Sequence, residues 1–178
     1  KLTDEKVIFA PNGERFSREK TILPPLLDYF HAQRNLAKKE SNDLKSFTFK
    51  IIMNSFYGVM GSVACRFRCA NLAGAVTGFG QQFLSVTRCW FEEQGYKVLY
   101  GDTDSLFVDI QCELDKSPDE IMEIGDSLCK NANMAIDAII KEEYQLESKL
   151  ELEFEKFYKH LIFPPARVGS GARAKSYA

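Results

Sequence analysis

The sequence predicts an α+β fold in which an antiparallel sheet is backed by helices and an antiparallel two-helix hairpin protrudes from it. Three observations indicate this class. Two helical patterns of hydrophobic residues flank a short polar run at residues 38–43, and two short apolar runs flank a Gly- and Asp-rich turn at residues 101–104. Two further long helical patterns lie on either side of that turn. Strand pairs interleaved with long helices favour helices packed on a sheet.

Size and charge limit the remaining classes. The chain has 178 residues and a mass of 20.3 kDa, enough for one sizeable core or a core with an arm. Its 23 basic and 25 acidic residues give a net charge of −2, so any binding to polyanions must come from local clusters. No run approaches the roughly 18 apolar residues of a membrane span, and five irregularly spaced cysteines suit reduced thiols. We therefore expect a soluble intracellular protein without a membrane partner.

The predicted hairpin consists of two helices. Pro24-Pro25 opens the first, because proline fits the first helical turn, where amide protons have no partners. Apolar residues then recur at helical spacing as far as a polar run. The second helix begins with Ser41 or Asn42 as its cap and is ended by Gly58 and Gly61.

Beyond the hairpin, four segments have a regular hydrophobic pattern. They are a helix at 72–94, strands at 96–100 and 106–110, and a helix at 118–144. The two strands are short apolar runs around a turn, which is typical of a β-hairpin. Residues 150–162 alternate in part like a strand, and the tail from Pro164 has the composition of a loop.

The turn between the predicted strands carries two acids. In the segment Tyr100-Gly-Asp-Thr-Asp-Ser105, Asp102 and Asp104 are two residues apart. Asp and Gly are ordinary turn residues, so composition alone is satisfied by a structural turn. The functional interpretation is a divalent-metal site, because Mg²⁺ favours carboxylate oxygens held on a rigid element.

The predicted hairpin carries a second polar cluster. Arg34 and Lys38 are spaced i, i+4, and Lys50, Asn54 and Tyr57 are spaced i, i+4, i+7, so each set shares one helix face. With residue 41 as the tip, the two sets come level about 10 to 14 Å from it. The cluster suits a pocket for several phosphates. The alternative is that these cations only solvate outer faces.

These residues resemble a known family. Residues 50–58 are similar to the K-x-x-x-N-S-x-Y-G motif of family B DNA polymerases, and residues 100–105 match that family's Y-G-D-T-D-S motif letter for letter. Arg34-x-x-x-Lys38 resembles the R-x-x-x-K of the family's fingers helix. Residues 64–67 are most similar to the bacterial DNA polymerase II branch.

Two further segments add to the resemblance. Residues 152–156 resemble the family's L-E-x-E strand, and residues 174–178 resemble its K-K-x-Y-A segment. The second match departs at Ala174, where a lysine is expected, which removes one contact to the DNA backbone. For Glu153 and Glu155 a solvent-facing position on a strand is favoured over a role in metal binding.

The resemblance implies a DNA-directed DNA polymerase that uses two Mg²⁺ ions to add deoxynucleotides to a primer 3′ end. It implies that Asp104 is a metal ligand and that Asp102 is a neighbouring catalytic acid of the same metal site. The implied nucleotide-binding residues are Arg34, Lys38, Lys50, Asn54 and Tyr57, and the implied DNA-binding residues are Lys175 and Tyr177. The implied partners are primer–template DNA, deoxynucleoside triphosphates and, through regions that this sequence does not include, a sliding clamp.

The resemblance also predicts the organisation of the chain. Residues 1–22 would be a lead-in segment on the palm side, residues 23–62 the fingers helical hairpin, and residues 63–178 the palm subdomain with the acidic hairpin. The family's first palm motif, D-x-x-S-L-Y-P, does not occur here. We therefore expect a fragment that is inactive alone, from a bacterial cytoplasmic, nucleoid-associated enzyme of DNA replication or repair.

Two alternatives belong to other classes. A polymerase-like palm that has lost its chemistry would be a non-catalytic module that binds DNA or a protein partner. A nucleotide cyclase would share the acidic hairpin, but it does not account for the string at residues 50–58.

Overall fold

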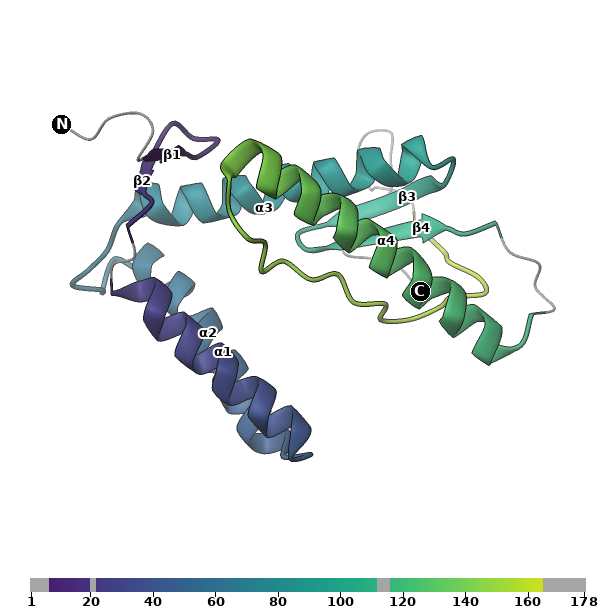
Figure 1. The fold of residues 1–178 in the computed structure, drawn as a ribbon, viewed down its shortest axis with the longest axis horizontal. Coiled ribbons are helices and arrows are strands. Elements are labelled where there is room, and N and C mark those ends of the chain that lie inside the picture. Colours follow the sequence, from purple (N-terminus) through teal and green to yellow (C-terminus); the bar gives the residue numbers. More distant parts are fainter. Residues whose placement is uncertain (1–6, 20–21, 112–115, 165–178) are drawn as a thin grey trace. The chain divides into compact units, whose positions relative to one another are not determined.

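The structure is a computed structural model that describes residues 7–19, 22–111 and 116–164 (Figure 1). The elements are β1 Val7–Phe9, β2 Arg15–Ser17, α1 Leu23–Lys39, α2 Asp43–Gly61, α3 Ala70–Glu93, β3 Lys97–Asp102, β4 Ser105–Asp109 and α4 Pro118–Tyr144. They form two compact units, residues 1–79 and residues 80–178. The predicted α+β class is confirmed.

The first unit begins with a small strand pair that the sequence analysis did not predict. β1 and β2 are antiparallel, with Val7 opposite Ser17 and Phe9 opposite Arg15. Gly13 adopts a φ of 83° in the turn between them, a left-handed conformation that glycine reaches without steric cost. Strands of three residues are too short to leave an alternating pattern in the sequence.

The helical hairpin of the first unit is confirmed. α1 and α2 lie side by side in Figure 1, and Asn42 caps α2 by accepting a hydrogen bond from the Lys45 amide at 3.0 Å. The Phe30 ring of α1 lies 5.9 Å from the Phe49 ring and 6.0 Å from the Phe56 ring of α2. The hairpin is thus held by aromatic packing along its length.

One predicted boundary of α2 is wrong. Gly58 was expected to take part in ending the helix, but α2 continues through it and ends at Gly61. A glycine inside a helix costs only about 1 kcal/mol relative to alanine, which the hydrogen bonds on either side can offset.

The second unit contains the acidic hairpin. β3 and β4 pair antiparallel as predicted, from Lys97 opposite Asp109 to Asp102 opposite Ser105. An irregularity in the register lies between Val98 and Tyr100. β3 rests on α3, since a Cβ at Gly101 would lie 4.0 Å from Leu84.

α4 supplies most of the buried core of the second unit. Its buried hydrophobic residues are spaced at helical intervals and include Ile121, Ala132, Ile136 and Ile140. At its C-terminal end, Tyr144 reaches α3. The Gln82 Nε2 donates a hydrogen bond to the Tyr144 hydroxyl at 2.9 Å. This hydrogen bond ties the C-terminal end of α4 to α3.

The segment after α4 differs from the prediction. Residues 145–164 contain no assigned strand, although strand-like alternation persists, with Leu152 and Phe154 half-buried and their neighbours exposed. Asn133 of α4 explains the difference, because its side-chain amide takes the place of a neighbouring strand. Its Nδ2 donates to the Leu152 carbonyl at 3.0 Å, and its Oδ1 accepts from the Leu152 amide at 2.8 Å.

Three further sequence predictions concern the DNA-binding residues, the cysteines and membrane-spanning segments. Lys175 and Tyr177 lie outside the described residues. The four cysteines within the described ranges, Cys65, Cys69, Cys89 and Cys129, are free thiols. In the described part of the chain, no helix combines the length and the apolar character needed to cross a membrane.

Candidate functional site

The acidic turn is a two-residue connection between β3 and β4. Because Asp102 pairs with Ser105, Thr103 and Asp104 alone form the loop. Thr103 has a φ of 54°, a left-handed conformation that a β-branched residue rarely adopts and that costs about 1 to 3 kcal/mol. Local strain of this kind is typical of positions where the surrounding structure fixes a functional side chain.

The two carboxylates of the turn have different surroundings. Asp102 is half-buried, and its Oδ1 accepts a hydrogen bond from the Thr103 hydroxyl at 2.9 Å. Asp104 is exposed, and its amide donates to the Asp102 carbonyl at 2.6 Å. The structure therefore anchors one carboxylate and presents the other to solvent.

Aromatic rings hold the acidic hairpin against the segment after α4. The Tyr100 ring lies 5.9 Å from the Phe107 ring and 5.4 Å from the Phe163 ring. The Phe107 ring lies 6.0 Å from the Tyr158 ring. These contacts link strands β3 and β4 to residues 158–163, so the turn projects from a packed base.

The acidic turn fits a hard divalent cation, but only in part. Two carboxylates two residues apart offer the oxygen donors that Mg²⁺ favours. Within the described ranges, no group of three or more His, Cys, Asp or Glu side chains could hold a metal ion. Asp102 and Asp104 would therefore hold Mg²⁺ together with oxygens from water, substrate phosphates or another segment.

The predicted basic stripe is the set Arg34, Lys38, Lys50, Asn54 and Tyr57, and all five lie on the helical hairpin of the first unit. Phe30 lies between Phe49 and Phe56, so it is level with residues 52 and 53. Arg34 lies four residues nearer the tip than Phe30, so in an antiparallel pair it is level with residues 48 and 49 of α2. Along the helix axis, Arg34 and Lys50 are therefore within about 3 Å of the same level.

The two halves of the basic stripe also border the same side of the hairpin. Half-buried residues such as Phe30, Phe49 and Phe56 mark the faces that α1 and α2 turn toward each other. At 100° per residue, Arg34 and Lys38 are rotated about the axis of α1 away from its inward face. Lys50, Asn54 and Tyr57 are rotated in the same sense away from the inward face of α2, each sense being taken along its own helix from N- to C-terminus. In an antiparallel pair, equal rotation brings both sets to one flank.

Arg34 has a buried polar atom without a partner. Its Nε is enclosed and has no hydrogen-bond partner among the described residues, whereas Lys50, Asn54 and Tyr57 are exposed. An unsatisfied guanidinium N–H costs free energy unless an acceptor arrives.

The two units carry opposite net charges, a feature that the sequence analysis missed by taking the chain as a whole. Residues 1–79 contain twelve basic and seven acidic residues, a net charge of +5. Residues 80–178 contain eleven basic and eighteen acidic residues, a net charge of −7. Counting charge along the sequence in windows would have revealed this separation of charge between the two units.

Comparison with known proteins identifies the relatives of this chain. The family described as DNA polymerase family B matches residues 2–164. DNA polymerase II of Escherichia coli (strain K12) is 40% identical over 163 residues, which are 92% of this chain and 20% of that protein. The DNA polymerase delta catalytic subunit of Bos taurus is 32% identical over 181 residues, covering 88% of this chain and 15% of that protein.

A solved structure agrees with this result. The family B DNA polymerase from the hyperthermophilic archaeon Pyrobaculum calidifontis superimposes with a TM-score of 0.62 at 25% sequence identity, covering 98% of this chain and 21% of that one. The chain thus spans only 20% and 15% of the lengths of these two curated relatives.

Proposed function

Because the chain belongs to DNA polymerase family B, we propose that the full-length protein is a DNA-directed DNA polymerase acting in DNA replication or repair. Its substrates would be primer–template DNA and deoxynucleoside triphosphates, and a sliding clamp would bind through other regions. The observation that carries the proposal is the strained two-residue turn, which presents Asp104 to solvent and anchors Asp102 beside it.

The proposed reaction is nucleotidyl transfer. The 3′ hydroxyl oxygen of the primer loses its proton and attacks the α-phosphorus of the incoming nucleotide. The bond to the bridging oxygen breaks, and pyrophosphate leaves with both electrons of that bond. Two bound Mg²⁺ ions would lower the pKa of the attacking hydroxyl and stabilise the charge on the leaving group.

The residues of the chain have separate tasks in this proposal. Asp104 and Asp102 would hold Mg²⁺. Arg34 would bind phosphate oxygens together with Lys38 and Lys50. In the same stripe, Asn54 would add an amide hydrogen bond, and the exposed Tyr57 ring would pack beside the nascent base pair.

The organisation predicted from the sequence enters the proposal unchanged. Residues 23–62 would be the fingers hairpin, residues 63–178 most of the palm, and residues 1–22 a lead-in segment. Lys175 and Tyr177 would contact the DNA duplex near the primer end. Since the sequence contains no D-x-x-S-L-Y-P string, residues 1–178 alone would lack a second anchoring acid and would be inactive.

Primer extension tests the proposal. The full-length protein, given Mg²⁺ and all four triphosphates, should lengthen a labelled primer, and residues 1–178 alone should not. Binding of primer–template DNA without extension by the full-length protein would favour the non-catalytic module instead.

A further inference from the structure

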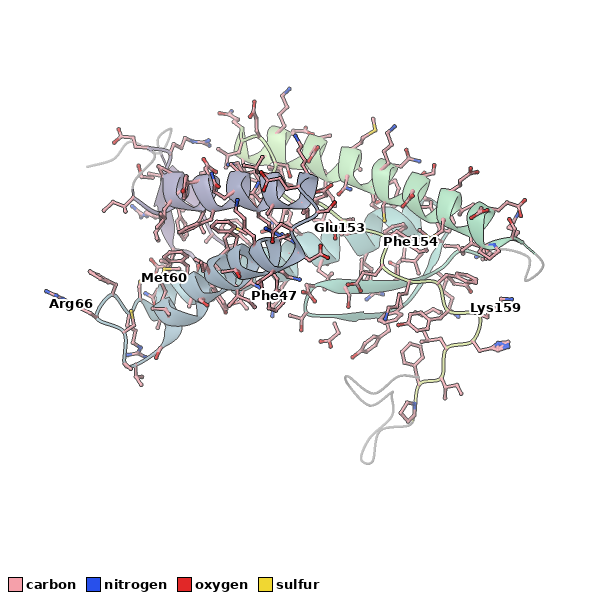
Figure 2. The ribbon with its side chains drawn as sticks, turned by 90° about the horizontal axis from the view of Figure 1, so that it is seen from below. Phe47, Met60, Arg66, Glu153, Phe154 and Lys159 are labelled. Carbon is pink, nitrogen blue, oxygen red and sulfur yellow. The ribbon has the colours of Figure 1, made fainter. Side chains whose placement is uncertain are left out.

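The loop that joins α2 to α3 in the first unit carries an aromatic ring between two arginines. We call residues Arg66, Phe67 and Arg68 the Arg-Phe-Arg loop. Phe67 is 78% exposed, and both arginines are exposed. Figure 2 shows Arg66 extending away from the end of α2. None of these residues belongs to the basic stripe or to the acidic turn.

The backbone of this loop is fixed by hydrogen bonds. The Cys69 amide donates to the Met60 carbonyl at 2.9 Å, which closes the loop against the end of α2. The Arg68 amide donates to the Cys65 carbonyl at 3.1 Å, and the Phe67 amide donates to the Cys65 Sγ at 3.3 Å. The ring is therefore displayed by an ordered backbone, which reduces the entropy lost when a ligand binds to it.

A second exposed phenylalanine of the same unit provides a contrast. Phe9 is 49% exposed, but the Arg15 guanidinium carbon lies 5.6 Å above the centre of its ring and covers one face. Among the described residues, no aromatic ring or cation is stacked on Phe67. Both faces of the Phe67 ring are available to a planar ligand.

The charge around the Arg-Phe-Arg loop specifies that ligand. Arg66 and Arg68 form no ion pair with an Asp or Glu among the described residues. An exposed ring between two arginines without a carboxylate partner suits single-stranded nucleic acid, whose bases stack on the ring while its phosphates pair with the arginines. A duplex is less suitable because its bases are already stacked on one another.

We propose that the Arg-Phe-Arg loop binds the unpaired template strand ahead of the primer, with a base stacked on Phe67 and phosphates held by Arg66 and Arg68. The identification of this strand as the template rests on the proposed polymerase function. α2 ends at Gly61, about 6 Å along the helix axis beyond Tyr57 of the basic stripe. The loop thus directly follows the end of the helix that would bind the incoming nucleotide and its templating base.

Equilibrium binding of primer–template DNA to the full-length protein tests this proposal. One DNA has a 5′ template overhang of about ten nucleotides and the other an overhang of one, since single-strand sites commonly span about 4 to 16 nucleotides. Phe67→Ala should weaken binding of the long-overhang DNA by about tenfold and leave the short-overhang DNA unchanged. Phe67→Trp should retain tight binding. Phe9→Ala is the matched control and should bind both DNAs normally.

Two further variants separate stacking from other contacts. Replacing both Arg66 and Arg68 with alanine should reduce the slope of log affinity against log salt by about 1.4 for the long overhang only. Phe67→Leu should bind as weakly as Phe67→Ala, because leucine is apolar but has no ring to stack. Normal binding by Phe67→Leu would overturn the proposal and indicate an apolar contact with another part of the polypeptide.

Wild-type affinity of Phe67→Ala for the long-overhang DNA, or an equal loss of affinity for both DNAs with an unchanged melting temperature, would also overturn the proposal. The binding assay contains no triphosphate and requires no turnover. A protein that showed the Phe67-dependent difference but did not extend primers would therefore contradict the polymerase function and still support a single-strand site. A protein that extended primers without that difference would contradict only the single-strand site.

Discussion

The helical hairpin of the first unit and the helix-backed β-hairpin of the second unit differ in how many residues their helices bury. α1 and α2 bury one residue between them, Ala37, and α2 leaves Phe47, Ile51 and Tyr57 exposed. α4 alone buries five residues and carries a complete capping box. We therefore call the first unit a surface, because its helices leave most of their side chains accessible, and the second a scaffold, because α4 buries a regular set of residues.

The difference in charge follows the difference in packing. Basic residues dominate the first unit, where long side chains can remain solvated until an anionic ligand arrives. Acidic residues dominate the second unit, where two of them stand on a strained turn supported by aromatic packing. Substitutions in the first unit should therefore change ligand binding more than stability, whereas those in the second unit should change stability or the chemical step.

The largest effect is expected at the acidic turn. In the full-length protein, Asp104→Asn should lower the turnover number by about three orders of magnitude, because loss of a metal ligand removes about 4 kcal/mol of transition-state stabilisation. Affinity for DNA should hardly change, since it depends on contacts between cations and phosphates. Steady-state extension rates and binding titrations measure the two quantities.

Asp109→Asn at the far end of β4 is the matched control. Its Oδ1 accepts a hydrogen bond from the Gln111 amide at 3.0 Å, and asparagine retains that acceptor. Normal turnover is expected. If Asp104→Asn lowered the turnover number by less than tenfold, which corresponds to about 1.4 kcal/mol, Asp104 would not be a principal metal ligand.

The next effect tests the surface character of the hairpin. Lys50→Ala in the full-length protein should lower kcat/KM for the incoming nucleotide by about two orders of magnitude, because the lost cation would face phosphate oxygens that gain charge in the transition state. Stability should change little, since Lys50 is exposed and alanine is a good helix former. Single-turnover kinetics and a thermal melt measure the two effects.

Lys45→Ala separates this role from a general loss of charge. Lys45 lies on the same helix, with its Nζ 3.7 Å from the Glu40 carboxylate. A partly exposed ion pair contributes no more than about 1 kcal/mol, so its removal should leave kinetics unchanged. Equal kinetic losses at both lysines would mean that only the net charge of the hairpin matters.

Elements with strong periodicity could be predicted from the sequence. The helix expected at 118–144 matches α4 residue for residue, and the cap predicted at Ser41 or Asn42 is Asn42. The β1–β2 pair could not be predicted because its strands have only three residues. The strand-like pattern predicted at residues 150–162 is not a strand in the structure, where the Asn133 side chain makes the hydrogen bonds to the Leu152 backbone that a neighbouring strand would make.

The candidate site could be predicted from the sequence to a different degree. Spacing along α1 and α2 predicted that each half of the basic stripe shares one helix face and that the two halves come level, because helix geometry is regular. The left-handed Thr103 was not predicted, because the sequence indicated a turn over residues 101–104 and not the two-residue turn that imposes a positive φ. The enclosure of the Arg34 Nε was not predicted either, because side-chain burial does not follow from helical spacing alone. The roles of all these residues in catalysis and binding remain predictions.

A smaller effect sharpens the contrast between surface and scaffold through one substitution in each unit. Gly125→Ala in α4 should destabilise the second unit by about 1 to 3 kcal/mol, because an added Cβ would lie 2.7 Å from the Phe154 ring. Gly58→Ala in α2 should stabilise its helix by about 0.5 to 1 kcal/mol, since nothing lies within 4 Å. Hydrogen exchange of α4 and α2 peptides in the full-length protein measures each effect. Destabilisation of α2 by Gly58→Ala would show that the hairpin is packed where the structure leaves it open.

The smallest effect concerns the cap of α4, which has no equivalent at the start of α1. Ser117 accepts a hydrogen bond from the Glu120 amide at 3.3 Å, and the Glu120 carboxylate accepts from the Ser117 amide at 2.8 Å. The hydrogen bond from the Ser117 backbone, and then that from its side chain, holds the pKa of Glu120 below its usual value. A lowered pKa in the folded state stabilises the fold above the unfolded pKa, about 4.3, and that stabilisation is lost as the pH falls through the folded value.

Glu120→Gln should therefore melt at a lower temperature than the wild type at pH 7, by no more than about 2 °C for a helix-end interaction of this kind. The difference should shrink as the pH falls below about 4.3 and through the lower pKa of the folded state, below which the wild-type carboxylate is also neutral. Glu123→Gln removes a charge one turn further along α4 without touching the cap, so it serves as the control for net charge. If the Glu120→Gln difference were the same at pH 7 and pH 3, the protonated carboxyl of Glu120 would support the cap as well as the carboxylate does, and the negative charge at this helix end would contribute nothing to stability.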